Sequence, residues 1–320
     1  MLISICIPCY RSAEALPAVI AEIKDEFSRR EGYDYQIVLV NDCSPDQTFA
    51  VIEQLCQEDE KIIGIDLSRN YGQASAKMAA LPYATGDAII YMDDDGQHPA
   101  AGIFRLLDKL AEGYDIVYAR FPQKHHSWFK RATSWLYQRV SELIGNKPRG
   151  ISVSSFTAWS RMAADAVTRY KSPFPAAGLY LNKVTTRIAN VDMEHRDRIA
   201  GESGYSLGKL LSLTVTALTN FSIIPLRIAS FAGVFCAIVG FLTGAAVVIR
   251  KFLNPAIAAG YTSSIAVQLF VGGVIMMILG ILGEYIGRIY MTVSNMPQYN
   301  IREVKNAPEL PSAGQSHPAV

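Results

Sequence analysis

The chain has little excess charge of either sign. Its 320 residues include 30 Lys and Arg against 29 Asp and Glu, which gives a formal net charge of +1 at pH 7. A nucleic-acid-binding domain normally carries a dense basic patch or stripe, and no stretch of that density occurs here. We therefore expect no nucleic-acid partner.

Cysteine is also scarce, with five residues in the whole chain. Cys6 and Cys9 form a CxxC pair, but they lie in a predicted strand, where residues three apart point to opposite faces. No second Cys or His pair completes a metal site, and His125 and His126 have no acidic or Cys ligand at suitable spacing. We interpret the cysteines as buried thiols of a reducing compartment.

Two common phosphate-binding motifs are missing. No GxGxxG follows the first predicted strand, and GxxxxGK[ST] occurs nowhere, so we expect carboxylates and a metal ion to hold any nucleotide. We also expect no signal peptide, because Met1 leads directly into the apolar segment LISICIP. We expect the N-terminal half to stay on the side of the membrane where it is made.

Apolar residues are abundant, at 50% of the chain. Two apolar runs, 223–249 and 265–290, each exceed the roughly 20 residues that cross a bilayer as a helix. Glu284, near the end of the second run, has the i, i+4 spacing that allows a pair with Arg288. The amphipathic segment 207–221 precedes these runs and is predicted to lie in the membrane interface.

Strand-like and helical segments alternate before residue 200. This pattern predicts a mostly parallel sheet with helices on both faces. The first helix is expected to begin at Ser12 or Ala13, and the second is expected to have its N-cap at Ser44 or Asp46. The predicted strands are 2–8, 35–40, 62–67, 88–92, 114–119 and 185–191.

Three adjacent carboxylates follow the apolar strand 88–92. Ligands of open α/β sheets bind at the carboxyl ends of the strands, so Asp93 and Asp95 are expected at the mouth of such a crevice. A divalent cation with oxygen ligands would offset their mutual repulsion. Asp42, after the strand 35–40, is expected to face the same crevice. The alternatives are a solvated acidic turn for the triplet and a turn or capping role for Asp42.

Arg69 and the basic segment 124–131 each allow two interpretations. Arg69 follows the strand 62–67 and could bind a phosphate or pair with a crevice aspartate. The basic and aromatic segment 124–131 could rest at the level of lipid headgroups, or form a solvated helix face whose aromatic residues enter the core.

Several motifs together resemble the family 2 glycosyltransferases that load a sugar onto polyprenyl phosphate. They are CIPCY, NDCSPD, LSRNYGQASA, MDDDGQHP, SWFKR, GESGYSL, PLRI and GEYIGRIY, in this order over nearly the whole chain. The chain is most similar to bactoprenol glucosyltransferases and undecaprenyl-phosphate aminoarabinose-type transferases. Dolichol-phosphate mannose synthases are more distant relatives.

This resemblance implies a GT-A nucleotide-sugar domain and a set of site residues. The residues implied to bind the nucleotide are Pro8, Tyr10, Asp42, Arg69 and Asp94. The implied ligands of Mg²⁺ or Mn²⁺ are Asp93, Asp95 and Gln97. The basic residues implied to meet donor or acceptor phosphates are Arg120, Arg131 and Arg198. Asp93 and Asp95 join these arginines as the implied catalytic residues.

The chain departs from the family's usual pattern in two places. Ser154 and Ser155 stand where Gly and Asp are usual, and Gly204 stands where a lysine is usual. No catalytic base can therefore be transferred to Ser155. A phosphate monoester has a second pKa of about 6, so the acceptor is already largely dianionic at pH 7 and needs no such base.

The resulting hypothesis is an inverting, metal-dependent transfer of one sugar from a UDP-sugar to undecaprenyl phosphate at the cytoplasmic face of the bacterial inner membrane. The expected organisation is a transferase domain (1–205), an interfacial helix (206–222), a transmembrane hairpin (223–292) and a cytoplasmic tail with a disordered end (293–320). A homo-oligomer, a tetramer by resemblance, is also expected. The alternatives are a processive polysaccharide synthase and a non-catalytic membrane scaffold.

Overall fold

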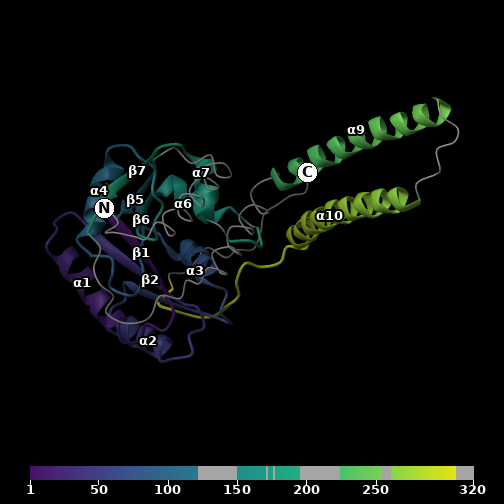
Figure 1. Ribbon diagram of the computed structural model, residues 1–320. Coiled ribbons are helices and arrows are strands. Elements are labelled where there is room, and N and C mark those ends of the chain that lie inside the picture. Colours follow the sequence, from purple (N-terminus) through teal and green to yellow (C-terminus); the bar gives the residue numbers. More distant parts are fainter. Residues whose placement is uncertain (122–149, 171, 176, 195–223, 254–260, 308–320) are drawn as a thin grey trace, which may run out of the picture. The chain divides into compact units, whose positions relative to one another are not determined.

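The computed structural model describes residues 1–121, 150–170, 172–175, 177–194, 224–253 and 261–307 (Figure 1). Its internal contacts divide the chain into two units. The first contains Met1–Tyr205 together with Asn295–Val320, and the second is Ser206–Ser294. The C-terminal segment is thus part of the first unit.

The first unit is built from alternating strands and helices. Its strands are β1 (Leu2–Cys9), β2 (Asp34–Asn41), β3 (Ile62–Leu67), β4 (Ala88–Tyr91), β5 (Ile116–Arg120), β6 (Thr157–Ser160), β7 (Ile188–Asp192) and β8 (Ile301–Lys305). Its helices are α1 (Leu16–Ser28), α2 (Thr48–Glu58), α3 (Gln73–Ala80), the short η1 (Leu81–Tyr83), α4 (Gly102–Ala111), α6 (Arg161–Thr168) and α7 (Ala177–Val184).

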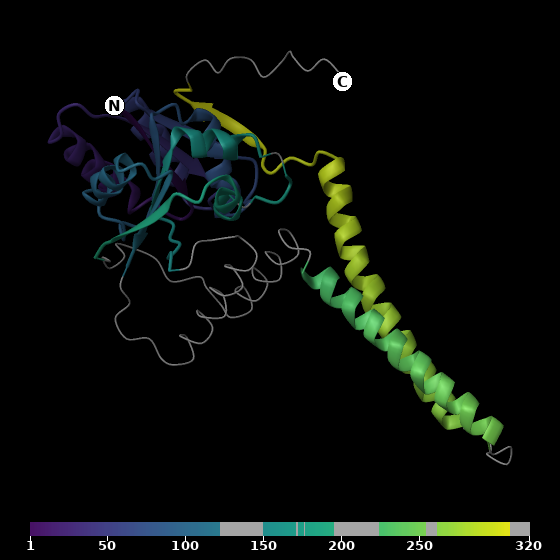
Figure 2. The same ribbon diagram turned by 90° about the horizontal axis from the view of Figure 1, so that it is seen from above.

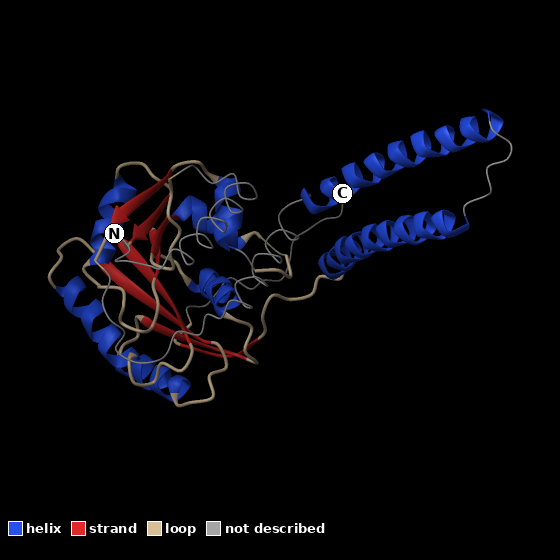
Figure 3. Ribbon diagram, in the orientation of Figure 1, coloured by secondary structure: helices blue, strands red, loops and turns tan. Residues whose placement is uncertain are grey.

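The strands form one sheet in the order β7-β5-β6-β4-β1-β2-β3-β8. Strands β6 and β8 run antiparallel to their neighbours, and the other strands are parallel to one another (Figure 3). The predicted mostly parallel α/β sheet is therefore confirmed. The carboxyl ends of β1 to β5 and β7 lie at one edge, and β6 begins at that same edge.

Helices cover both faces of the sheet, as the alternation of side chains along β1 illustrates. Ile3, Ile5 and Ile7 pack in a core with helices α1, α2 and α4, whereas Cys6 belongs to the core under α3, α6 and α7. Figure 1 shows these two groups of helices on opposite sides of the strands. Burial of both faces explains why the strand sequences are almost continuously apolar.

Two predicted helix starts lie too early in the chain. Helix α1 begins at Leu16 because Ser12 first closes a turn, in which its carbonyl accepts from the N–H groups of Ala15 and Leu16. The N-cap of α2 is Gln47, although Asp46 Oδ1 does accept from the Thr48 backbone N–H at 3.2 Å. Asp46 therefore supports this helix from one residue further out than a capping residue.

The structure also contains two strands that were not predicted. Strand β6 is inserted antiparallel between β4 and β5, and β8 pairs antiparallel with β3 at the edge of the sheet. Both are short, and each joins a partner that is distant in the sequence. Local patterning carries little information about such pairings.

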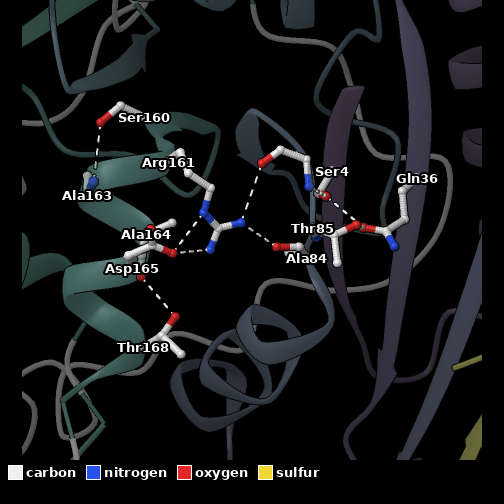
Figure 4. Close-up of polar contacts among 11 residues, drawn as sticks. Ser4, Gln36, Ala84, Thr85, Ser160, Arg161, Ala163, Ala164, Asp165 and Thr168 are labelled. Carbon is white, nitrogen blue, oxygen red and sulfur yellow. Dashed lines mark hydrogen bonds and ion pairs between the residues drawn. The ribbon is translucent and has the colours of Figure 1, made fainter. Parts of the chain in front are cut away.

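A network of polar side chains lies at the edge of the sheet opposite to the aspartate triplet (Figure 4). Arg161 donates to the carbonyls of Ala84 at 2.6 Å and Gly86 at 3.4 Å, and it pairs with Asp165. On neighbouring strands, Ser4 Oγ donates to Gln36 at 2.7 Å. The Arg161 contacts hold α6 against the chain that enters β4.

The second unit contains two long apolar helices, α9 (Ile224–Leu253) and α10 (Tyr261–Val293), which run beside each other (Figure 2). Within the described residues, their segments Ala229–Ala246 and Phe270–Val293 are long and apolar enough to cross a membrane, each with a mean hydropathy of 1.9. Arg288 pairs with Glu284, as their spacing predicts. The predicted interfacial helix, 206–222, lies outside the described residues.

Candidate functional site

Four neighbouring strands deliver polar side chains to one edge of the sheet. Tyr10 follows β1, Asp42 follows β2, Arg69 lies just beyond β3, and Asp93 lies just beyond β4. These strands are adjacent in the order β4-β1-β2-β3. Pro8, a predicted nucleotide-binding residue, is buried inside β1 opposite Val40 of β2.

Asp42 shapes a loop of the site through its carboxylate. One oxygen accepts from the backbone N–H of Tyr71 at 2.7 Å, and the other accepts from that of Gly72 at 2.8 Å. Burial raises the pKa of Asp42, and these two hydrogen bonds oppose the shift. Gly72 has φ 87° and ψ 158°, a backbone conformation that only glycine adopts readily. Asp42 and the 68–72 loop therefore form one preorganised unit.

The turns after β1 and β2 contain backbone strain. Arg11 and Cys43 have φ values of 58° and 50°, which are uncommon for residues other than glycine. The two turns are joined, because Arg11 N–H donates to Ser44 Oγ at 2.8 Å and Asp42 N–H donates to the Cys9 carbonyl at 3.0 Å. Strain of this kind concentrates at ligand-binding sites.

Asp93 is held by donors from two other elements. Gln73 Nε2, at the start of α3, donates to Oδ1 at 2.8 Å, and Ser155 Oγ donates to Oδ2 at 2.5 Å. The backbone N–H of Asp93 donates to Nδ1 of the buried His98 at 3.0 Å. The His98 ring lies parallel to Phe156 with 4.9 Å between ring centroids, so packing fixes the whole turn.

The other two aspartates of the triplet have different surroundings. Asp94 Oδ2 accepts from the Tyr10 backbone N–H at 3.0 Å, and burial raises the pKa of Asp94. Asp95 Oδ1 accepts from the backbone N–H of Gln97 at 3.1 Å and so stabilises the turn that follows it. The triplet is therefore more than a solvated acidic loop, since the carboxylates of Asp93 and Asp94 are held by residues from distant parts of the chain.

The oxygen-bearing side chains around Asp93 and Asp95 suit a hard divalent cation. Carboxylate and amide oxygens of Asp93, Asp95 and Gln97 are the ligand types that Mg²⁺ and Mn²⁺ prefer. Among the described residues no group of three His, Cys, Asp or Glu side chains converges as a preformed metal cluster. A cation held by one or two carboxylates together with substrate phosphates requires no such cluster.

The predicted arginines have separate positions. The Arg69 guanidinium carbon lies 4.6 Å from the centroid of the Tyr71 ring, a contact that neither proposed role for Arg69 anticipated. Arg120, at the end of β5, forms an ion pair with Asp192 at the end of β7. Arg131 and Arg198 lie outside the described residues, as does Gly204.

Four further residues lie around Asp93, and the sequence alone predicts no site role for them. Gln73 and Ser155 hold Asp93, and His98 supports its backbone. Lys77, one helical turn after Gln73, places Nζ 3.5 Å from the Ser155 carbonyl. Burial lowers the pKa of Lys77, while the charge of Asp93 opposes that shift. The i, i+4 spacing of Gln73 and Lys77 is the only sequence signal that links any of them.

Comparison with known proteins gives matches over nearly the whole chain. Residues 4–169 match the Glycosyl transferase family 2, and residues 224–289 match the GtrB C-terminal hairpin. The prophage bactoprenol glucosyl transferase homolog of Escherichia coli is 33% identical over 95% of this chain and 100% of its own length. The undecaprenyl-phosphate 4-deoxy-4-formamido-L-arabinose transferase of Proteus mirabilis is 32% identical over 94% and 93%. The uncharacterized glycosyltransferase YkcC of Bacillus subtilis is 31% identical over 94% and 93%.

Proposed function

Since the chain belongs to the family 2 glycosyltransferases and has the GtrB C-terminal hairpin, we propose that it transfers one sugar from a nucleotide sugar to undecaprenyl phosphate. The relatives from Escherichia coli and Proteus mirabilis are named for bactoprenol and undecaprenyl phosphate, and each aligns along nearly its full length. The observation that carries the proposal is the joint presence of the strand-end carboxylate site and two apolar helices in one chain.

The proposed donor is a UDP-sugar bound at the carboxyl edge of the sheet. Asp42 and Asp94 hold the surrounding backbone, and Tyr10, which is 43% exposed, offers an aromatic face to the nucleoside. A Mg²⁺ or Mn²⁺ ion, held by Asp95 with Asp93 and Gln97, would neutralise charge on the departing diphosphate. Gln73 and Ser155 keep the Asp93 carboxylate in one orientation.

The proposed reaction is a single displacement at the anomeric carbon. A phosphate oxygen of the lipid forms the new bond while the bond to the nucleoside diphosphate breaks, which inverts the anomeric configuration. The acceptor is largely ionised at neutral pH, so the hydroxyl of Ser155 is compatible with the reaction. The main task of the protein is to align two anions that repel each other, and arginines near the acceptor would reduce that repulsion.

We propose that the protein is anchored in a membrane, because the chain contains the two apolar helices α9 and α10. Large apolar side chains on these helices are exposed, including Phe231, Phe241 and Phe252 at 74%, 76% and 84%. Exposed apolar side chains of this size along two long helices fit a lipid environment. The cytoplasmic orientation at a bacterial inner membrane, the homo-oligomer and the division at residues 205, 222 and 292 remain predictions.

Purified full-length protein, given labelled nucleotide sugars one at a time with undecaprenyl phosphate and Mg²⁺, tests the function. We expect one sugar to appear as a lipid-linked monosaccharide with inverted configuration. A longer lipid-linked glycan would favour a processive synthase. Calorimetric titration with UDP and Mn²⁺ addresses the remaining alternative, because absence of both binding and transfer would favour a scaffold.

A further inference from the structure

We propose that strand β8 and the residue before it, Asn300, belong to the donor site, where Asn300 and Arg302 act as positioning residues for the loop 68–72. This inference rests on the proposed function, because it assumes that Asp42 and the 68–72 loop bind the nucleotide. Strand β8 follows the second apolar helix in the chain, and nothing in its sequence, IREVK, resembles a nucleotide-binding motif.

The C-terminal segment contacts the loop at several points. The Ser68 backbone N–H donates to the Asn300 carbonyl at 2.9 Å, and Asn300 Nδ2 donates to the Tyr71 hydroxyl at 3.1 Å. Arg302 Nη2 donates to the Ser68 carbonyl at 3.0 Å. The same loop presents the N–H groups of Tyr71 and Gly72 to Asp42. The conformation of the 68–72 loop therefore depends on residues more than 220 positions further along the chain.

A buried acidic residue provides a second route from β8 to Asp42. Asp66, at the end of β3, is 3% exposed, and its two oxygens meet Arg302 Nη1 at 2.9 Å and Asn41 Nδ2 at 2.7 Å. Asn41 directly precedes Asp42 in the chain. A buried carboxylate without an opposite charge is costly. The charge of Arg302 therefore stabilises Asp66, which positions Asn41 through its hydrogen bond.

The alternative is that β8 only protects the edge of the sheet. Without β8, β3 would expose a row of unpaired backbone groups, and covering such an edge prevents aggregation. Edge protection requires the backbone pairing of β8 but not the side chains of Asn300 and Arg302. Substitution of those side chains therefore separates the two roles.

The test uses full-length protein in detergent with the variants Arg302→Ala and Asn300→Ala. Lys305→Ala is the matched control, because Lys305 lies on the same strand and pairs with Glu53 and Glu303, away from the loop. Two quantities are measured: hydrogen exchange of the backbone amides of residues 69–73 without nucleotide, and KM and kcat for the nucleotide sugar.

We expect both variants to accelerate exchange in residues 69–73 and to raise the donor KM, by about tenfold for Arg302→Ala, with a smaller change in kcat. Lys305→Ala should match the wild type in both measurements. If Arg302→Ala fails to fold because Asp66 loses its partner, Asn300→Ala decides the question, since it leaves that ion pair intact.

Unchanged exchange and an unchanged donor KM in a folded variant would overturn the inference and leave edge protection as the role of β8. Failure of the proposed function has a different result, because wild-type protein would then transfer no sugar. The exchange measurement contains no nucleotide, so it reports on the loop in either case.

Discussion

Ser155 donates its hydroxyl hydrogen to Asp93, with 2.5 Å between Oγ and Oδ2. Asp93 follows β4 and Ser155 precedes β6, and because these strands are antiparallel neighbours the two residues meet at the same edge. The families that this chain resembles usually have an aspartate at the position of Ser155. A second carboxylate at this distance would repel Asp93, whereas the hydroxyl donates a hydrogen bond to it.

Ser155→Asp should therefore reduce activity rather than restore a missing group. Two carboxylates in contact raise each other's affinity for a proton, so we expect kcat/KM at pH 7 to fall more in Ser155→Asp than in Ser155→Ala. The measurement is the initial rate of sugar transfer. Ser154→Ala is the control, because Ser154 Oγ donates to the Phe156 carbonyl instead. Wild-type or higher activity in Ser155→Asp would show that an acid is tolerated beside Asp93.

Gly72→Ala should impair donor binding through the backbone alone. No atom lies within 4 Å of the added Cβ, so the cost is the strained conformation at φ 87° and ψ 158°, about 1 to 3 kcal/mol. Relaxation of that strain would move the backbone N–H group of Gly72, which donates a hydrogen bond to Asp42. We expect a higher donor KM and a lower thermal midpoint.

Gly113→Ala is the control for this substitution. Gly113 has φ 98° and equally open surroundings, but it lies in the turn after α4. It should lose stability without a change in donor KM. Equal KM values for the two variants would mean that the 68–72 loop does not bind the donor.

Asp42→Asn should change how stability depends on pH. Burial raises the pKa of Asp42 in the folded protein, so folded protein binds more protons than unfolded protein between the ordinary value of 3.8 and the raised one. The wild type therefore loses free energy of unfolding as pH rises through that window, and the asparagine variant lacks this loss. Thermal midpoints measured from pH 4 to pH 7 should shift in favour of the variant as pH rises. A constant difference would contradict the assigned pKa direction.

The same substitution should weaken donor binding at neutral pH. An amide can accept from one of the two N–H groups of Tyr71 and Gly72, but its own NH₂ group would face the other. We expect the donor KM to rise while kcat changes less. An unchanged donor KM would show that Asp42 is dispensable for nucleotide binding.

The sequence predicted much of the sheet because its inner strands are apolar on both faces. Ile62–Leu67 was predicted with the observed bounds, and the carboxyl-end rule placed Asp42 and Asp93 at one edge. Strand β6 was missed because TAWS is short and follows a long connection from β5. Strand β8 was missed because IREVK alternates weakly and pairs with a strand far back in the chain.

The support around Asp93 was beyond prediction for the same reason. Gln73, Ser155 and His98 come from three separate segments, and only the fold brings them to one carboxylate. The sequence marked Ser155 as a departure from a family pattern, but it could not show that its hydroxyl meets Asp93. The roles proposed for Arg131 and Arg198 remain predictions, since both lie outside the described residues.

The role of the strand-end carboxylates is tested most directly by comparing metal-dependent sugar transfer by Asp95→Asn with that by wild type. The control is Asp87→Asn, because Asp87 accepts from the Leu2 backbone N–H at the opposite edge of the sheet, at 2.9 Å. With undecaprenyl phosphate, the preferred nucleotide sugar and Mn²⁺, we expect wild type and Asp87→Asn to form the lipid-linked sugar. Asp95→Asn should form it at a rate lower by about a hundredfold or more, and chelation of the metal should stop the wild type. Full activity of Asp95→Asn, or of wild type in excess chelator, would contradict the proposed role of the strand-end carboxylates.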